Sequence, residues 1–322
     1  MPPTGRVVRG ASALAGVGLA CAALHQRKSA PVLADPGVRL STGARIPSLG
    51  LGTYLANGEE LHEAILTALA VGYRHIDTAA GYANERVVAA AIRASGLPRD
   101  AIFLTTKLWC DSHGSAPTRE AIAKSLRALG TDYVDLYLIH APDNQGLRAD
   151  DIRRLRLESW MAMEAAHNEG SLRAIGVSNF EPRHIEQLLC CEDGTPREGA
   201  VVPAVNQIET HPHFDQRATR DYCARKGIAV EAYGALQPDV LSDPEVERVA
   251  AAHGRSPAQV SLRHTLQRGT IVLAKSLTPS RIAENARVFE FSLSEEDCAA
   301  LDALARDPHR DGRNYWDNSD VP

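Results

Sequence analysis

Two patterns alternate along the sequence between residues 38 and 304. Short runs rich in Val, Ile, Leu and Tyr are followed by longer runs in which apolar residues recur every three or four positions. The first pattern is typical of buried strands and the second of amphipathic helices. The strand-like runs are residues 48–54, a run that ends at residue 77, and residues 101–108, 132–140, 172–180, 203–209, 228–236 and 270–276. The helical runs are residues 59–71, 85–95, 118–129, 152–169, 182–189, 216–226, 244–252, 257–267 and 279–287.

This alternation predicts a parallel sheet, because each helix returns the chain to begin the next strand in the same direction. Eight strand–helix units in about 250 residues fit one closed (β/α)8 TIM barrel. The sequence also predicts an N-terminal β-hairpin at residues 38–46, with Gly43 in its turn, and an extra C-terminal helix at residues 294–304. A doubly wound dinucleotide-binding sheet is disfavoured, because residues 50–53 lack the third glycine and the helix start of that motif.

Composition excludes some classes of partner. The formal net charge is −5 and aromatic residues make up 5% of the chain, so neither a basic field nor stacking platforms indicate a nucleic-acid partner. The six cysteines form no CxxC spacing, and we expect reduced thiols in an intracellular protein without a metal site.

Residues 1–34 differ from the rest of the chain and are treated as an N-terminal extension to a barrel domain at 35–322. They contain no acidic residue, and an apolar stretch at 10–24 is flanked by basic residues. This stretch is short for a membrane span. A signal peptide, a transit peptide, a signal anchor and a disordered extension all remain open. We expect a cytoplasmic protein, with targeting to a mitochondrion or plastid as the alternative, and membrane contact only through residues 1–34.

Polar residues stand where the predicted strands end. In a barrel these ends meet on one face, where active sites form. The residues at these ends, or in the loop that follows, are Asp77, Tyr82, Lys107, His140, Ser178, Asn179, Gln207, Tyr233, Lys275 and Ser276. Each has a structural explanation by itself; Asp77 and Lys107, for example, could form a buried ion pair. Their convergence on one face favours a chemical role.

The chemistry that this set supports is proton donation to an oxyanion. A lysine ammonium beside a phenol favours the phenolate and lowers the pKa of the phenol. A carboxylate keeps the lysine charged and in place, and an imidazole can hold a substrate oxygen.

Several segments resemble the signature segments of the aldo-keto reductases over about residues 38–307. They are GYRHIDTAAGYANE, LTTKLW, DLYLIHAP, AIGVSNF, NQIETHP and KSLTPSRIAENARVFEFSLS. The resemblance implies an NADPH-dependent oxidoreductase of the aldehyde reductase (alcohol dehydrogenase (NADP+)) type, which reduces aldehydes and ketones to alcohols. Its catalytic residues are implied to be Asp77, Tyr82, Lys107 and His140. Tyr82 is implied as the general acid, Lys107 and Asp77 tune it, and His140 orients the substrate.

The resemblance also implies the residues that bind NADPH or NADP+. Thr53 is placed near the nicotinamide ribose, Tyr233 on the nicotinamide face, and three residues at its carboxamide: Ser178, Asn179 and Gln207. Asp77 is also expected among the cofactor-binding residues. The adenosine 2′-phosphate is assigned to Lys275, Ser276, Thr278 and Arg281, and the adenine to Glu284 and Asn285. A lysine and an arginine around an extra phosphate also favour NADP over NAD on chemical grounds.

The substrate pocket is expected to involve Tyr54, Trp109 and His140. The chain departs from the family pattern at Ala141, where an aromatic residue is common, and at Ala274, where proline is common. The YGALQP segment also replaces a more usual Tyr-Ser-Pro-Leu. The tail at 307–322 carries Tyr315 and Trp316, and it either folds over the substrate or frays.

The leading interpretation is a monomeric enzyme acting on a small-molecule carbonyl substrate, whose identity the sequence leaves open. The alternative is a nicotinamide-binding regulatory or partner-binding subunit that resembles the potassium-channel β subunits. A metal-dependent barrel enzyme is a weaker third possibility, because His and carboxylate ligands are not clustered at the strand ends.

Overall fold

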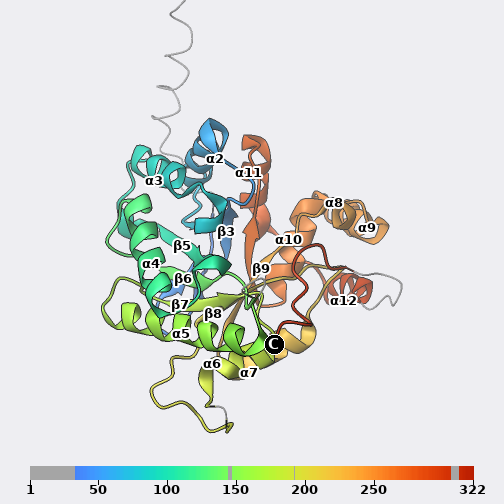
Figure 1. The fold of residues 1–322 in the computed structure, drawn as a ribbon. Coiled ribbons are helices and arrows are strands. Elements are labelled where there is room, and N and C mark those ends of the chain that lie inside the picture. Colours follow the sequence, from blue (N-terminus) through green and yellow to red (C-terminus); the bar gives the residue numbers. More distant parts are fainter. Residues whose placement is uncertain (1–32, 144–146, 192, 306–311) are drawn as a thin grey trace, which may run out of the picture.

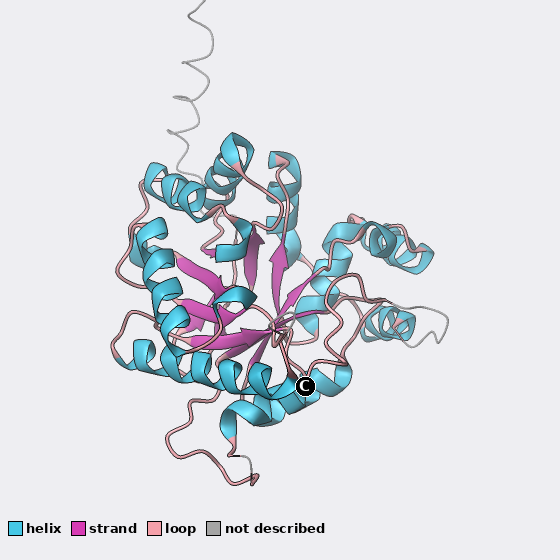
Figure 2. Ribbon diagram, viewed as in Figure 1, coloured by secondary structure: helices cyan, strands magenta, loops and turns pink. Residues whose placement is uncertain are grey.

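A computed structural model describes residues 33–143, 147–191, 193–305 and 312–322. Its centre is a closed barrel of eight parallel strands in the order β10-β3-β4-β5-β6-β7-β8-β9. Figure 2 shows the strands as an inner ring with helices packed outside it. The predicted (β/α)8 architecture is therefore confirmed. Most of the predicted N-terminal extension, residues 1–32, lies outside the described residues, and so does Cys21.

The strands are short and nearly all of their side chains are buried. They are β3 Leu49–Gly52, β4 His75–Asp77, β5 Phe103–Leu108, β6 Leu136–Ile139, β7 Ile175–Ser178, β8 Val205–Glu209, β9 Ala229–Tyr233 and β10 Ile271–Ala274. Parallel strands are covered on both faces, which explains why their sequences read as continuous apolar runs. The predicted runs were longer than the strands because residues beyond the last ladder bond remain buried in loops.

The helices match the predicted helical runs, with differences at their starts. They are α2 Gly58–Ala70, α3 Glu85–Ala94, α4 Ser115–Leu129, α5 Ala149–Asn168, α6 Pro182–Leu189, α7 Arg217–Lys226, α8 Pro238–Leu241, α9 Pro244–His253, α10 Pro257–Gln267, α11 Pro279–Ala286 and α12 Glu295–Leu304. Both α4 and α5 begin three residues earlier than predicted. Pro117 lies inside the first turn of α4, where its missing N–H costs no helical hydrogen bond. The short helix α8 was not predicted.

The N-terminal hairpin closes one end of the barrel. Strands β1 Val38–Arg39 and β2 Arg45–Ile46 pair antiparallel, and Gly43 has the positive φ of 85° that the turn requires. Leu40 and Ile46 are buried in a cluster with residues at the beginnings of the barrel strands, such as Phe103 and Leu136. The hairpin therefore covers the end of the barrel where the strands begin, and the opposite end is left for a cavity.

Leu33, the first described residue, already packs against the main core, two residues before the expected domain boundary. In the described ranges no helix is both long enough and apolar enough to cross a bilayer.

Candidate active site

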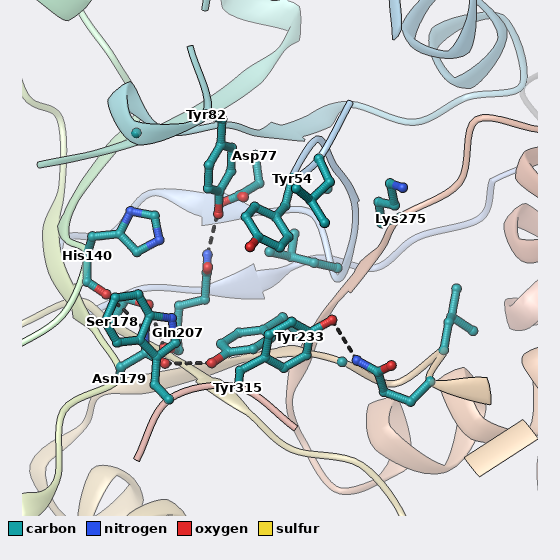
Figure 3. A pocket seen from close by; sticks show the side chains of 18 of the residues that line it. Tyr54, Asp77, Tyr82, His140, Ser178, Asn179, Gln207, Tyr233, Lys275 and Tyr315 are labelled. Carbon is teal, nitrogen blue, oxygen red and sulfur yellow. Dashed lines mark hydrogen bonds between the residues drawn. The ribbon is translucent and has the colours of Figure 1, made fainter. Parts of the chain in front are cut away.

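A cavity of about 270 Å³ lies at the end of the barrel where the strands finish (Figure 3). Most of the residues singled out in the sequence line it: Tyr54, Asp77, Tyr82, Trp109, His140, Ser178, Asn179, Gln207, Tyr233 and Lys275. The C-terminal segment adds Tyr315 and Trp316. Residues that are up to about 260 positions apart in the chain therefore share one cavity, as the barrel topology predicts.

The floor of the cavity holds a buried ion pair beside a phenol. The Nζ of Lys107, on β5, donates to Asp77 Oδ1 at 2.6 Å and to the backbone oxygen of Thr78 at 3.0 Å. The same Nζ lies 3.2 Å from the hydroxyl oxygen of Tyr82. Asp77 ends β4, which pairs with β5 in parallel register, and this pairing brings the carboxylate and the ammonium together. All three donor positions of the ammonium are thus used.

A short 3₁₀ turn, Ala80–Tyr82, carries Tyr82 back over the ion pair. Gly81 makes this return possible, because a Cβ at this position would collide with the indole of Trp109. Ala83 follows in the left-handed region with φ 55°, which ends the turn and directs the chain into α3. The tight loop therefore fixes where the phenol points.

Burial and charge act in opposite directions on these groups. Burial raises the pKa of Tyr82 to about 12, and the neighbouring Lys107 reduces this rise without reversing it. The expectation from Lys107 alone was a lowered phenol pKa, so the net direction in this structure is opposite to it. Burial alone would lower the pKa of Lys107, but the charge of Asp77 and the hydrogen bonds to Asp77 and Tyr82 outweigh burial and raise it. At neutral pH the site therefore combines a protonated phenol with a charged lysine.

His140 follows β6 and forms a second wall. Its ring packs edge-on against Tyr82 with centroids 5.5 Å apart and against Trp109 at 4.9 Å. Burial, followed by the charge of Lys107, lowers the pKa of His140 well below its usual value. The imidazole is therefore neutral near pH 7, and its Nε2 can either donate or accept a hydrogen bond, depending on the tautomer.

The third wall is a hydrogen-bonded set of side chains on β7, β8 and β9. The hydroxyl of Tyr233 donates to Asn179 Oδ1 at 2.7 Å, and Asn179 Nδ2 donates to the backbone oxygen of His140 at 2.8 Å (Figure 3). The Ser178 hydroxyl donates to the backbone oxygen of Gln207 at 2.9 Å. Asn179 has a positive φ of 63°, a conformation that Asn tolerates better than most residues. The side chains of this wall are therefore already oriented by hydrogen bonds within the protein.

Thr53 does not line the cavity. Its side chain is fully buried and its hydroxyl donates to the backbone oxygen of Asp77 at 2.9 Å. In this structure Thr53 therefore supports the end of β4. It does not face the cavity, where the predicted contact with the nicotinamide ribose would be made.

The segment assigned to the cofactor phosphate and adenine runs from the end of β10 into α11. Lys275 and Arg281 are exposed, and within the described residues neither forms an ion pair. Ser276 Oγ accepts from the backbone N–H of Thr278 at 3.1 Å, while Thr278 itself is exposed. Two cationic side chains thus stand free at the N-terminal end of a helix, where anions are favoured.

The two residues assigned to the adenine differ in how they are engaged. The Ser256 hydroxyl donates to Glu284 Oε1, which links α10 to α11. Asn285 is buried, and its Oδ1 has no hydrogen-bond partner among the described residues. Glu284 therefore already accepts a hydrogen bond from another residue of the protein, whereas Asn285 has an acceptor without a partner among the described residues.

The described part of the C-terminal tail, residues 312–322, packs over the cavity and is not frayed. Trp316 lies 6.3 Å from Trp109 and 6.2 Å from His140 between ring centroids, and Tyr315 lies 5.3 Å from Tyr233. The carboxylate of Glu209, at the end of β8, accepts from the backbone N–H groups of residues 314 and 315. The segment is therefore anchored to the barrel and forms the outer wall of the cavity.

Sequence reasoning missed two buried residues that support the site, Asn84 and Glu231. Asn84 links the loop after β3 to the side chain of Thr78 after β4, near Tyr82, and Glu231 lies beneath Gln207. The signal for Glu231 was available, since it is an acidic residue two positions before Tyr233 in an otherwise apolar strand. In a strand, residues two apart share a face.

Comparisons with known proteins agree with this geometry. The model of the Aldo/keto reductase family matches residues 48–306. The glyoxal reductase of Bacillus subtilis is 42% identical over 272 residues, which cover 84% of this chain and 93% of that protein. The glycerol 2-dehydrogenase (NADP(+)) of Saccharomyces cerevisiae is 39% identical over 290 residues, covering 83% and 90%. The crystal structure of an aldo/keto reductase from Brucella melitensis is similar with a TM-score of 0.77 at 42% identity, covering 84% of this chain and 99% of that one.

Proposed function

Because the chain belongs to the aldo/keto reductase family, we propose that it reduces aldehydes or ketones to alcohols with NADPH. The observation that carries this proposal is the contact of Lys107 Nζ with both Asp77 and the Tyr82 hydroxyl at the floor of the cavity. This arrangement supplies a proton where a carbonyl oxygen can reach it. The same cavity is lined by side chains that suit a nicotinamide.

The residues fit NADPH in three respects. Tyr233 offers an aromatic face and Gln207 an amide on the cavity wall. Lys275 and Arg281 are exposed cations, without an ion-pair partner among the described residues, on the segment assigned to the 2′-phosphate, as the chemistry of a dianion requires. Asn285 Oδ1, which has no hydrogen-bond partner in the described part of the chain, is an acceptor for an adenine amino group. The relative from Saccharomyces cerevisiae is named as an NADP(+) enzyme, which supports the same cofactor here.

Four side chains carry the proposed chemistry. When bound, the nicotinamide supplies the hydride that reduces the carbonyl carbon. Tyr82 gives its proton to the carbonyl oxygen as negative charge develops there, because a forming alkoxide is a far stronger base than a phenolate. Lys107 then stabilises the phenolate from 3.2 Å, and Asp77 keeps the ammonium charged and in place. Neutral His140 holds the carbonyl oxygen beside Tyr82 by a hydrogen bond.

The substrate is proposed to be a small carbonyl compound. A cavity of about 270 Å³ with walls of Tyr54, Trp109 and Trp316 favours compact molecules with an apolar or planar part. The named activity of the Bacillus subtilis relative, glyoxal reduction, is consistent with a small aldehyde. An aldehyde reductase is accordingly the finer proposal.

A spectrophotometric assay tests the proposal. The oxidation of NADPH, and then of NADH, is followed with a small aromatic aldehyde for the wild type, Tyr82→Phe and Tyr133→Phe. We expect turnover with a preference for NADPH, and a loss of about 10²- to 10⁴-fold in Tyr82→Phe alone, because the general acid is removed. Tyr133 is the matched control, since its ring lies between Arg99 and Arg173, away from the cavity.

Three outcomes would count against parts of the proposal. Full turnover in Tyr82→Phe would contradict the general acid. NADPH binding by calorimetry without turnover would favour the regulatory or partner-binding alternative. Neither binding nor turnover would contradict the proposed function as a whole.

A further inference from the structure

A second acidic side chain, Glu231, lies in the barrel interior directly beneath the cavity wall. It is fully buried on β9 and its Oε2 accepts a hydrogen bond from Gln207 Nε2 at 2.5 Å. The same nitrogen donates to Asp77 Oδ2 at 2.9 Å, and this bond is visible in Figure 3. Two carboxyl groups from different strands therefore share one side-chain amide.

The side-chain amide of Gln207 has its donors paired within the protein and its acceptor on the cavity side. Its NH₂ group has two N–H donors, and both are used, one on Asp77 and one on Glu231. Among the described residues, the hydrogen bonds of this side chain all involve its nitrogen and none reaches its Oε1, although the side chain lines the cavity. The oxygen is thus the part of the amide that is left for a ligand.

The carboxylate of Asp77 favours this orientation of the Gln207 amide. Asp77 is paired with Lys107 and can only accept hydrogen bonds, so a carbonyl oxygen turned toward it would be repelled. Without Glu231, one N–H of Gln207 would be buried without a partner, and the amide could rotate to bring it to the cavity. We propose that Glu231 is a positioning residue that locks Gln207 with its oxygen toward the cavity.

The surroundings of Glu231 indicate that it does this as an uncharged carboxyl group. Its Oε1 has no hydrogen-bond partner among the described residues, which would be costly for a carboxylate. The groups that face it are Asp77, Lys107, Gln207 and His75, whose Nε2 lies 3.5 Å from Oε1. Burial, followed by the charge of Asp77, raises the pKa of Glu231 to about 8. A glutamine at this position, which is uncharged and has nearly the same shape, should therefore hold Gln207 in the same way.

The consequence concerns cofactor recognition and rests on the proposed function. A nicotinamide carboxamide presents one C=O acceptor and one NH₂ donor. The fixed Oε1 of Gln207 can accept only from the NH₂ group. Glu231 would in this way select the orientation of the carboxamide without touching the cofactor.

The test compares two cofactors and two substitutions. The probes are NADPH and reduced 3-acetylpyridine adenine dinucleotide phosphate, in which an acetyl group replaces the carboxamide and no N–H remains. Dissociation constants are measured by calorimetry for the wild type, Glu231→Leu and Glu231→Gln. We expect the wild type to prefer NADPH about tenfold, the value of roughly one hydrogen bond. Glu231→Leu should bind NADPH about tenfold more weakly and the analogue unchanged, so that the preference disappears.

Glu231→Gln should keep the preference, because its amide oxygen still accepts the N–H of Gln207. Glu85→Gln is the matched control, since Glu85 is also buried but accepts from Thr106 at 2.7 Å outside the cavity. If Glu231→Leu does not fold, as judged by circular dichroism, Glu231→Met provides a second apolar side chain, whose thioether is only a weak acceptor.

The outcomes separate this inference from the proposed function. A Glu231→Leu or Glu231→Met protein that keeps the full preference for NADPH would overturn it. A loss of affinity for both cofactors alike would also overturn it, because that result indicates general loosening of the barrel. A wild type that binds neither cofactor would instead overturn the proposed function on which the inference rests.

Discussion

Asn84 ties together the loops that surround Tyr82. It is fully buried, its Nδ2 donates to the backbone oxygens of Thr53 and Ala56, both at 2.9 Å, and its Oδ1 accepts from Thr78 at 2.5 Å. It stands at the N-cap of α3 but does not cap that helix. Its hydrogen bonds join loops that follow two neighbouring strands, so this one side chain determines how closely they approach the cavity.

We expect Asn84→Ala to lower the free energy of unfolding by about 2–4 kcal/mol, because it leaves buried backbone and hydroxyl groups unpaired. Urea denaturation with linear extrapolation measures the change. Asn168→Ala, on the exposed surface of α5, should change stability by less than about 0.5 kcal/mol. Equal losses in the two variants would show that the hydrogen bonds of Asn84 contribute little.

At this scale the sequence predicts positions better than it predicts environments. Asp77, Lys107 and His140 could be placed at the cavity, because the ends of parallel barrel strands must meet. The direction of the pKa shift of Tyr82 could not be predicted, since it depends on how much burial opposes the charge of Lys107. Glu231 was missed because its partners, Gln207 and Asp77, come from other strands and only the closed barrel brings them together.

Among the secondary-structure elements, α11 is the one that the proposed function uses as an anion site. Its first turn is preceded by Lys275 and contains Arg281, and neither side chain is neutralised by an acidic partner within the described residues. The helix N-terminus adds a partial positive charge. We therefore expect these positive charges to stabilise bound NADPH, through its 2′-phosphate, more than bound NADH, which lacks that phosphate.

Arg281→Ala should reduce the ratio of kcat/KM for NADPH to that for NADH by about tenfold, the effect expected for one charge-assisted hydrogen bond. The activity with NADH should hardly change. Arg287→Ala removes a similar charge that is already paired with Glu290, and its ratio should stay at the wild-type value. A fall in the efficiency of both cofactors after Arg281→Ala would place its role elsewhere than at the phosphate.

The existence and order of these elements could be predicted, but not all of their limits. Periodicity identified each barrel strand, and the Pro at the start of helices such as α9 and α11 marked where they begin. The helix α8 has only four residues, too few for a helical period to show. The path of the tail over the cavity depends on Glu209, whose acceptors are used by backbone groups about 105 residues later in the chain.

At the scale of the whole molecule, several histidines are buried without charge. Burial lowers the pKa of His75 to about 3 and those of His113 and His184 to about 4. In the unfolded chain each would titrate near 6.5. Between about pH 4 and 6.5 the unfolded state therefore binds more protons than the folded state, so the free energy of unfolding falls as the pH is lowered.

We expect the stability to decrease below pH 6.5, by up to about 1.4 kcal/mol per pH unit for each such histidine. Glu231 acts in the opposite direction, because its pKa of about 8 favours the folded state at low pH. Urea midpoints at several pH values measure the slope. His113→Leu should flatten it by one proton, since neither ring nitrogen of His113 has a hydrogen-bond partner among the described residues. An unchanged slope in this variant would contradict the prediction.

The aromatic walls of the cavity also give the molecule a built-in optical reporter. Of its three tryptophans, Trp109 and Trp316 line the cavity, whereas Trp160 is fully buried on α5. Reduced nicotinamide absorbs where indole emits, so its arrival beside these two rings should quench their fluorescence by energy transfer. Ligand binding can therefore be followed from the intrinsic emission of the unlabelled protein.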